Sequence, residues 1–96
     1  MEIDIEGFDY NILYTHLDNM IFDLSRNNLT RSIPMSIGSM ISLWLLNLYG
    51  NQLEGEIPTC ISNLFMLEQL DLSKNKLNGG IPLELSKLSM LVVLDI

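Results

Sequence analysis

The residues best suited to chemistry are few in this sequence and stand far apart. Cys60 is the only cysteine and His16 the only histidine. Nucleophilic catalysis and zinc binding both need such side chains gathered with further partners. The pair Gly79-Gly80 lacks the rest of a phosphate-binding loop. We therefore expect no catalytic activity, no cofactor, no bound metal and, with one cysteine, no disulfide within the chain.

Charge and hydropathy limit the partners. The net charge is −7, and four acidic residues fall among the first nine. An acidic surface repels the phosphates of nucleic acids, so we expect no nucleic-acid partner.

The acidic N-terminus also lacks the pattern of a signal peptide. Residues 32–53 are uncharged and of membrane-spanning length, but they contain Pro34, Gly38 and Asn47, which are unfavourable in a span. We expect no membrane span in this chain.

Residues recur along the chain with a fixed period of 24. The step links several triplets: Leu43, Leu67 and Leu91; Leu46, Leu70 and Leu94; Leu48, Leu72 and Ile96; Asn27, Asn51 and Asn75; Ile33, Ile57 and Ile81; Pro34, Pro58 and Pro82. A period between 20 and 50 residues is typical of a solenoid, in which each repeat packs only on its neighbours.

Two shorter spacings alternate within each repeat. Leu70 and Leu72 are two residues apart, which places both side chains on one face of a short strand. Leu85, Leu88 and Leu91 are three apart, which keeps one face only in 3-10 geometry. Each repeat is therefore predicted to form one strand and one tight helical return. Stacking would bring the strands into a parallel sheet with a spacing of about 4.8 Å.

The segment between strand and return is predicted to reverse the chain. Its asparagine, Asn51 in the second repeat, can bond backbone groups of the turn and of the next repeat through its buried amide. Gly55 and Gly79 permit backbone angles that a side chain would oppose. The isoleucine that follows is expected in the core, and the proline starts the return.

The pattern LxxLxLxxNxLxGxIPxxLxxL resembles the plant-type leucine-rich repeat over residues 19–96. The resemblance implies an α/β fold: a right-handed leucine-rich repeat solenoid with a short parallel sheet on the concave face and 3-10 or irregular returns on the convex side. Three repeats would start at residues 19, 43 and 67, and the first strand of a fourth at 91. In this family the asparagines Asn27, Asn51 and Asn75 would form a structural ladder.

A narrower resemblance covers the first part of the chain. FDYNILYTHLDNMIFDLSRNNL, followed by IGSM and LWLLNL, is similar to the repeats after the non-repeat island of brassinosteroid and phytosulfokine receptor kinases. Residues 1–18 would then be an irregular segment, the tail of an island domain. Three features depart from the family pattern. Arg31 replaces the glycine of the turn, so the first turn is expected to be distorted. Asn19 replaces a leucine, and the paired-cysteine caps are missing. We expect a segment of a longer protein.

Outward positions of the predicted sheet are the candidate binding residues. The row Asp23, Asn47, Asp71 and Asp95 could recognise a cationic ligand, but aspartate is also part of the ordinary repeat pattern, and a structural role is favoured. A strip of aromatic and aliphatic residues, formed by Met20, Ile21, Trp44, Leu45 and Tyr49 and extended by Val92 and Val93, could be a binding hot spot. It could instead be buried against a neighbouring segment, such as an island, or against the stack itself. The candidate ligand- and partner-binding residues are Met20, Ile21, Asp23, Trp44, Leu45, Asn47, Tyr49, Gln69 and Asp71.

Asn28 begins the only N-glycosylation sequon, Asn28-Leu29-Thr30. Its position beside the ladder asparagine is expected to be exposed, so glycosylation is feasible if the chain enters the secretory pathway.

Two classes of function remain open from the sequence. The first is a recognition segment of a plant receptor-like ectodomain at the plasma membrane, which binds a peptide, a small hormone or a co-receptor. The second is a stand-alone adaptor, inhibitor or decoy, cytosolic in the absence of a signal peptide. A third possibility is a segment that completes a solenoid and contacts no ligand.

Overall fold

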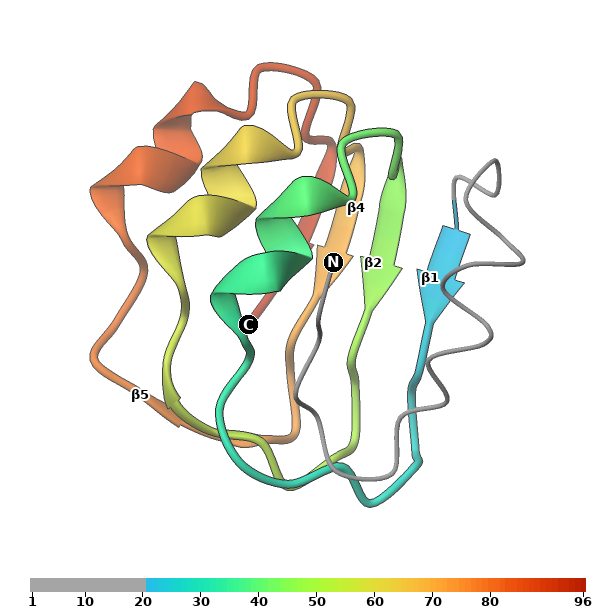
Figure 1. The fold of residues 1–96 in the computed structure, drawn as a ribbon, viewed down its shortest axis with the longest axis vertical. Coiled ribbons are helices and arrows are strands. Elements are labelled where there is room, and N and C mark those ends of the chain that lie inside the picture. Colours follow the sequence, from blue (N-terminus) through green and yellow to red (C-terminus); the bar gives the residue numbers. More distant parts are fainter. Residues whose placement is uncertain (1–20) are drawn as a thin grey trace.

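The computed structural model describes residues 21–96 as a stack of strand–turn–helix units (Figure 1). Residues 1–18, with the expected island tail and His16, lie outside the described residues, as do Asn19 and Met20. The elements in order are β1 (Ile21–Asp23), η1 (Met35–Ser39), β2 (Leu45–Asn47), β3 (Glu54–Glu56), η2 (Thr59–Asn63), β4 (Gln69–Asp71), β5 (Lys76–Asn78), η3 (Leu83–Lys87) and β6 (Val93–Asp95).

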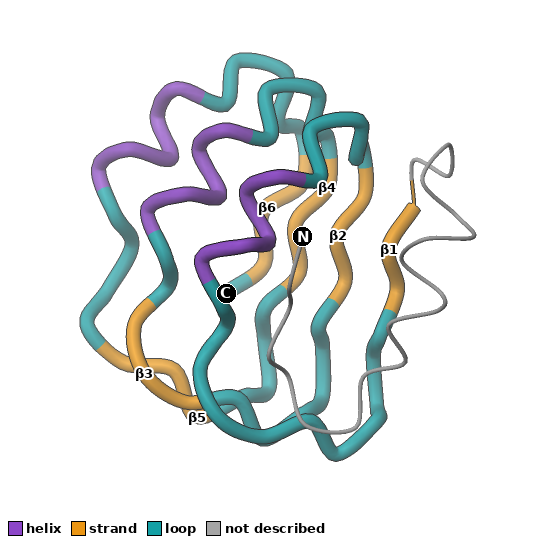
Figure 2. Tube along the Cα trace, viewed as in Figure 1, coloured by secondary structure: helices purple, strands orange, loops and turns teal. Residues whose placement is uncertain are grey.

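The main sheet has four parallel strands in the order β1-β2-β4-β6. Its register follows the sequence period: Phe22 pairs with Leu46, Leu46 with Leu70, and Leu70 with Leu94. The three 3-10 helices form a parallel row on the other side of the stack (Figure 2). This arrangement confirms the predicted solenoid with a parallel sheet on one side and tight helical returns on the other.

Each helical return starts at the repeated proline. Pro34, Pro58 and Pro82 are the N-cap residues of η1, η2 and η3, with φ of −75°, −70° and −62°. A fixed φ near this value suits the start of a helix and needs no N–H donor. The first bond of each helix runs to the proline carbonyl, at 3.1 Å from the amide nitrogen of Ile37 in η1. The spacing of three therefore marks 3-10 helices, as predicted.

The core lies between the sheet and the helices and consists of repeated columns of apolar side chains. Phe22, Leu46 and Leu70 are each 5% exposed or less. The prediction that the isoleucine points into the core holds for Ile33 and Ile57, both 4% exposed, but is wrong for Ile81, which is 57% exposed. Ile81 belongs to the last repeat, and no further repeat in the described chain packs over it.

A second sheet runs along the turn edge of the stack and was not predicted. β3 and β5 pair in parallel, with Gly55 opposite Leu77, and Ser32 forms an isolated bridge with Glu54. The offset is 22 residues here and 24 in the main sheet. β3 reads Glu-Gly-Glu and β5 reads Lys-Leu-Asn, so each strand is too short to show an alternation of apolar residues, which explains why the sequence did not reveal them.

Arg31 occupies the turn position of Gly55 and Gly79 and takes up their backbone conformation. Its φ is +69°, against +80° and +87° for the glycines. The Arg31 carbonyl accepts a 2.9 Å hydrogen bond from the amide of Glu54. The expected distortion is therefore absent at Arg31 itself. It appears instead at Asn28, whose φ of +56° has no counterpart at the equivalent Gln52.

Close packing between η1 and η2 depends on Gly38. A Cβ at this position would lie 2.8 Å from the carbonyl oxygen and 2.9 Å from the Cβ of Cys60. Because the first of these atoms is backbone, it cannot turn aside as a flexible side chain does. We expect Gly38→Ala to lower the free energy of unfolding by about 1–3 kcal/mol through overpacking. Urea denaturation measures the effect, with the exposed Ser39→Ala in the same helix as a near-neutral control; equal midpoints for both variants would contradict this account.

No helix in residues 21–96 is long and apolar enough to cross a lipid bilayer.

Candidate functional site

The carboxamide of Asn51 ties two repeats together. Its Oδ1 accepts hydrogen bonds from the backbone N–H groups of Asn27 and Leu29, at 2.9 and 3.0 Å. Its Nδ2 donates to the carbonyls of Leu24 and Leu48, both at 3.0 Å. Asn51 is 7% exposed. This side chain satisfies four backbone groups that strand pairing leaves unpaired.

The ladder points in the opposite direction to the one expected. Asn51 bonds the repeat before it, and Asn75 does the same, accepting from Leu53 N–H and donating to the Leu48 carbonyl. Asn75 is half-buried, whereas Asn27 is exposed and its side chain donates to the Ser25 carbonyl. Asn51 and Asn75 thus each stabilise the turn of the repeat that precedes their own.

The outward face of the main sheet carries one row of mainly apolar side chains. The row contains Ile21, Leu45, Gln69 and Val93, which pair across the sheet. Ile21 is 43% and Val93 49% exposed, while Leu45 is half-buried. Regular strand pairing therefore brings these candidates, which are 24 residues apart in sequence, side by side on one surface.

The second outward row holds the acidic and amide residues, and these are engaged in local turns. The Oδ1 atoms of Asp23, Asn47 and Asp71 each accept a 3.0 Å hydrogen bond from the N–H two residues further on. Asp71 Oδ1 also accepts a 2.6 Å bond from Ser73 Oγ. These bonds lie within each repeat, so the row supports its own turns. These bonds occupy part of the acceptor capacity that a cationic ligand would use.

Trp44 and Tyr49, the aromatic candidates, stand at opposite ends of β2, and neither is fully open to solvent. Both are half-buried. Trp44 precedes the strand, and its carbonyl accepts bonds from the N–H groups of Glu68 and Gln69 at 2.8 and 3.0 Å. Val92, at the equivalent position before β6, is 78% exposed. The strip is therefore interrupted: its most open side chains are Val92 and Val93, beside and in β6, followed by Ile21 on β1.

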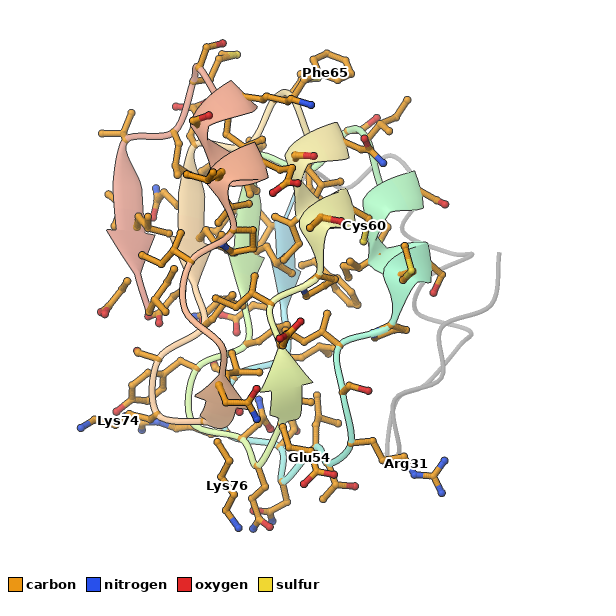
Figure 3. The ribbon with its side chains drawn as sticks, turned by 90° about the vertical axis from the view of Figure 1, so that its left-hand side faces the viewer. Arg31, Glu54, Cys60, Phe65, Lys74 and Lys76 are labelled. Atoms are coloured by element: carbon orange, nitrogen blue, oxygen red, sulfur yellow. The ribbon has the colours of Figure 1, made fainter. Side chains whose placement is uncertain are left out.

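A cationic edge, formed by Arg26 and Lys74, borders the sheet where the strands end. It was not predicted from the sequence. The guanidinium of Arg26 lies over the ring of Tyr49, 5.5 Å from its centroid, in a cation–π contact. Arg26, Gly50 and Lys74 are equivalent positions 24 residues apart, with φ of +57°, +71° and +56°. Figure 3 places Lys74 at this turn edge. The only indication of this edge in the sequence is that two cations, Arg26 and Lys74, occupy equivalent positions in two repeats.

Cys60 is a free, half-buried thiol in η2, on the side of the stack away from the sheet (Figure 3). Within residues 21–96, no three His, Cys, Asp or Glu side chains come together as a metal site would require.

Burial raises the pKa of the Cys60 thiol, and hydrogen bonds to the backbone at Gly38 and at Cys60 itself oppose the shift only in part. A raised pKa means less thiolate at any pH below it, and the thiolate is the reactive form. We expect alkylation by iodoacetamide to be slower than for a cysteine in a short unfolded peptide, with its pH midpoint displaced upward. Rates measured across pH in native protein and in urea test this; a native midpoint equal to or below the unfolded one would contradict it.

Comparison with known proteins gives a consistent result. The Leucine Rich Repeat family matches residues 20–40, 42–64 and 66–88, which is more than half of the chain. No curated protein is significantly similar to the chain.

Solved structures similar to the chain are plant receptor ectodomains. The Arabidopsis receptor kinase HAESA, in complex with the peptide hormone IDA and the co-receptor SERK1, matches with a TM-score of 0.84 and 33% identity over 94% of this chain and 15% of that one. The BIR3–SERK2 complex of Arabidopsis thaliana matches with a TM-score of 0.74 and 41% identity over 78% and 40%. The plant peptide hormone receptor RGFR1, in complex with RGF2, matches with a TM-score of 0.75 and 36% identity over 77% and 12%.

The chain therefore spans less than half the length of these structural relatives. With its 24-residue register, parallel sheet, asparagine ladder and matching repeats, it belongs to the leucine-rich repeat family and is of the plant type.

Proposed function

We propose that the chain is a ligand-recognition segment of a plant leucine-rich repeat receptor-like ectodomain, which binds a peptide, a small hormone or a co-receptor through the outward face of its main sheet. The observation that carries the proposal is the pair of adjacent rows on that face, one mainly apolar and one acidic, which regular strand pairing holds in register. The similar structures support it, since HAESA and RGFR1 are in complex with peptide hormones.

The mechanism is apolar burial on a rigid frame. The main-sheet strands are hydrogen-bonded to their neighbours, and side-chain bonds fix the turns that follow them, such as the one from Tyr49 N–H to Asn47 Oδ1. Little conformational entropy is then lost at this surface when a ligand binds. A ligand would cover the apolar row with its own apolar groups and meet the cationic edge with a carboxylate. No covalent step is involved.

The test begins with peptides selected from a random display library against the folded chain. For these peptides, we expect Leu45→Ala and Tyr49→Ala to raise the Kd at least about tenfold, which corresponds to ~1.4 kcal/mol. Phe65→Ala is the matched control, because Phe65 is 58% exposed but lies on the turn after η2, away from the sheet face (Figure 3). Circular dichroism confirms that each variant is folded.

Two outcomes count against the proposal. One is a set of selected peptides that bind the Leu45 and Tyr49 variants as tightly as the parent chain. The other is a loss of affinity confined to Phe65→Ala, which would move the binding surface to the turn after η2.

We further propose that the receptor segment lies outside the cell and carries a glycan on Asn28. Asn28 is exposed, in a turn with φ of +56°, while the middle residue of its sequon, Leu29, is 1% exposed. The chain, fused to a signal peptide and expressed in plant cells, should lose glycan mass on treatment with an N-glycosidase, and Asn28→Gln should abolish that shift. An unchanged mass in the parent chain would contradict the assignment.

A further inference from the structure

The cations of this acidic chain gather on the turns that follow the main-sheet strands. Four of the five lie between a main-sheet strand and the next helix: Arg26, Arg31, Lys74 and Lys76. Figure 3 shows three of them, Arg31, Lys74 and Lys76, at the lower edge of the stack. Arg26 is exposed although a full repeat follows it, so the openness of this edge comes from the turns and does not depend on the last repeat.

The two residues of the cationic edge, Arg26 and Lys74, occupy a backbone conformation that favours glycine. Their φ angles are +57° and +56°, and Gly50, at the equivalent position of the middle repeat, has φ of +71°. A residue with a Cβ is strained in this conformation, whereas glycine is not. Gly50 shows that the turn itself needs no side chain here. The reason for a cation at the other two positions therefore lies in what its side chain contacts.

Gly50 leaves a gap between the two cations, and Arg26 leans into it. A Cβ on Gly50 would lie 3.3 Å from Cγ of Arg26, whose guanidinium reaches the ring of Tyr49. Two strand spacings, about 10 Å, separate the backbones of Arg26 and Lys74 along the stack. Within residues 21–96, Lys74 and the nearby Lys76 form no ion pair. The edge thus presents exposed positive charges in a line along the stack.

An open edge of this kind selects a ligand by the number of its charges. One ion pair in water contributes little, so a lone carboxylate gains little here. A polymer with a carboxylate in every unit can meet several cations in one binding event. Asp23 and Asp71 precede the two cations by three residues and keep part of their acceptor capacity. They repel a dense row of phosphates but accept hydrogen bonds from hydroxyl groups, so an acidic sugar suits both kinds of group.

We propose that the cationic edge, together with Lys76, binds a linear polyuronate, an acidic polysaccharide with one carboxylate on each sugar. The carboxylates pair with Arg26 and Lys74, and the hydroxyl groups between them donate to Asp71. The inference rests on the proposed location outside the cell, and it assigns this polymer to the turns beside the sheet face that is proposed to bind peptides.

Fluorescence polarisation of the 96-residue chain with a labelled linear oligogalacturonate tests the proposal. Added salt should weaken binding, because the contacts are ionic. Lys74→Gln should raise the Kd about threefold and the double variant with Arg26→Gln at least about tenfold, since one exposed ion pair contributes up to about fivefold. Lys87→Gln, which removes the same charge from η3, should leave the Kd unchanged. No binding by the parent chain, or equal weakening by Lys87→Gln, overturns the proposal.

Three further ligands test the chemistry of the partner. The fully methyl-esterified oligomer has no carboxylates and should not bind, and galacturonic acid alone should bind far more weakly than the oligomer. Equal affinity for either of them would overturn the polyuronate assignment. Single-stranded DNA bound more tightly than the oligogalacturonate would overturn it as well and point to a nucleic acid.

Lys74→Gly separates binding from folding. Glycine adopts the φ of +56° without strain, as Gly50 does in the preceding repeat, so the urea midpoint should not fall. The Kd for the oligogalacturonate should nevertheless rise as it does for Lys74→Gln. An unchanged Kd in this variant would show that the Lys74 side chain does not contact the polymer, and the proposal would be wrong.

Leu45→Ala distinguishes this inference from the proposed function. It should weaken the peptides selected against the sheet face and leave the Kd for the oligogalacturonate unchanged. Peptide binding without binding of the oligogalacturonate overturns the present inference alone. Binding of the oligogalacturonate without any peptide binding overturns the sheet-face proposal and supports this one.

Discussion

Asn51→Ala is expected to lower the free energy of unfolding by about 3–5 kcal/mol, the largest effect of any single polar substitution in the described chain. The carboxamide makes four bonds of 2.9–3.0 Å with backbone groups of two repeats. Alanine leaves the Asn27 and Leu29 N–H groups and the Leu24 carbonyl without this partner, while the Leu48 carbonyl keeps its bond from Asn75 Nδ2. A buried unsatisfied group costs about 1–3 kcal/mol. Because the total stability of a small domain is about 5–15 kcal/mol, this loss brings the chain close to unfolding.

The asparagine ladder supplies its own controls. Asn75→Ala should cost less than Asn51→Ala, because Asn75 is only half-buried and water can replace part of its bonding. Asn27→Ala should cost least, since Asn27 is exposed. Urea denaturation at one protein concentration gives the three midpoints. Equal losses at Asn27 and Asn51 would show that burial does not set the cost, and the role assigned to the buried carboxamide would then be wrong.

Leu70→Ala is expected to lower the free energy of unfolding by about 2–5 kcal/mol. Leu70 is 0% exposed and lies in the middle of β4, between β2 and β6. Truncation removes apolar surface from a position with a repeat on either side, and two layers of neighbours would have to move to fill the cavity. The same urea measurement reports the loss.

Leu94→Ala is the matched control for this second prediction. Leu94 occupies the same column one repeat later, in β6, but is 43% exposed in the single chain. In the same urea measurement, Leu94→Ala should cost less than half as much as Leu70→Ala. Equal costs would mean that the terminal repeat packs as tightly as the central one, against its observed exposure.

The hydrogen bonds within the chain both make the frame rigid and engage the polar groups of its turns. The polar groups of the main-sheet turns are bonded within the chain, as Asp71 is to Ser73 and Asn51 is to the preceding repeat. The outward face then offers its mainly apolar row, the cations Arg26 and Lys74 at the edge, and the remaining acceptor capacity of the acidic row. A ligand that fits this face gains mostly from burial of apolar surface, and its specificity comes from the few charged groups at the margin.

The sequence by itself determined the period, the register of the main sheet, and the identity of its strands and of the helical returns. The 24-residue step places Leu46 beside Leu70, and the spacing of three after Pro58 gives the 3-10 helix η2. These features depend on local backbone preference and on contact between neighbouring repeats. The residues responsible for both recur in every repeat. The turn conformation at Gly55 likewise follows from residue type, and Arg31 shows that the fold enforces it even without glycine.

Tertiary structure alone decided how open each copy of a repeated residue is. Ile57 and Ile81 occupy the same position of the repeat, each directly before a proline, yet they are 4% and 57% exposed. The contact of Arg26 with Tyr49 and the pairing of β3 with β5 likewise join residues more than twenty positions apart. No apolar pattern in the sequence predicts either of them. The physical reason is that burial depends on having a repeat on both sides, and a periodic sequence specifies the repeat without specifying its neighbours.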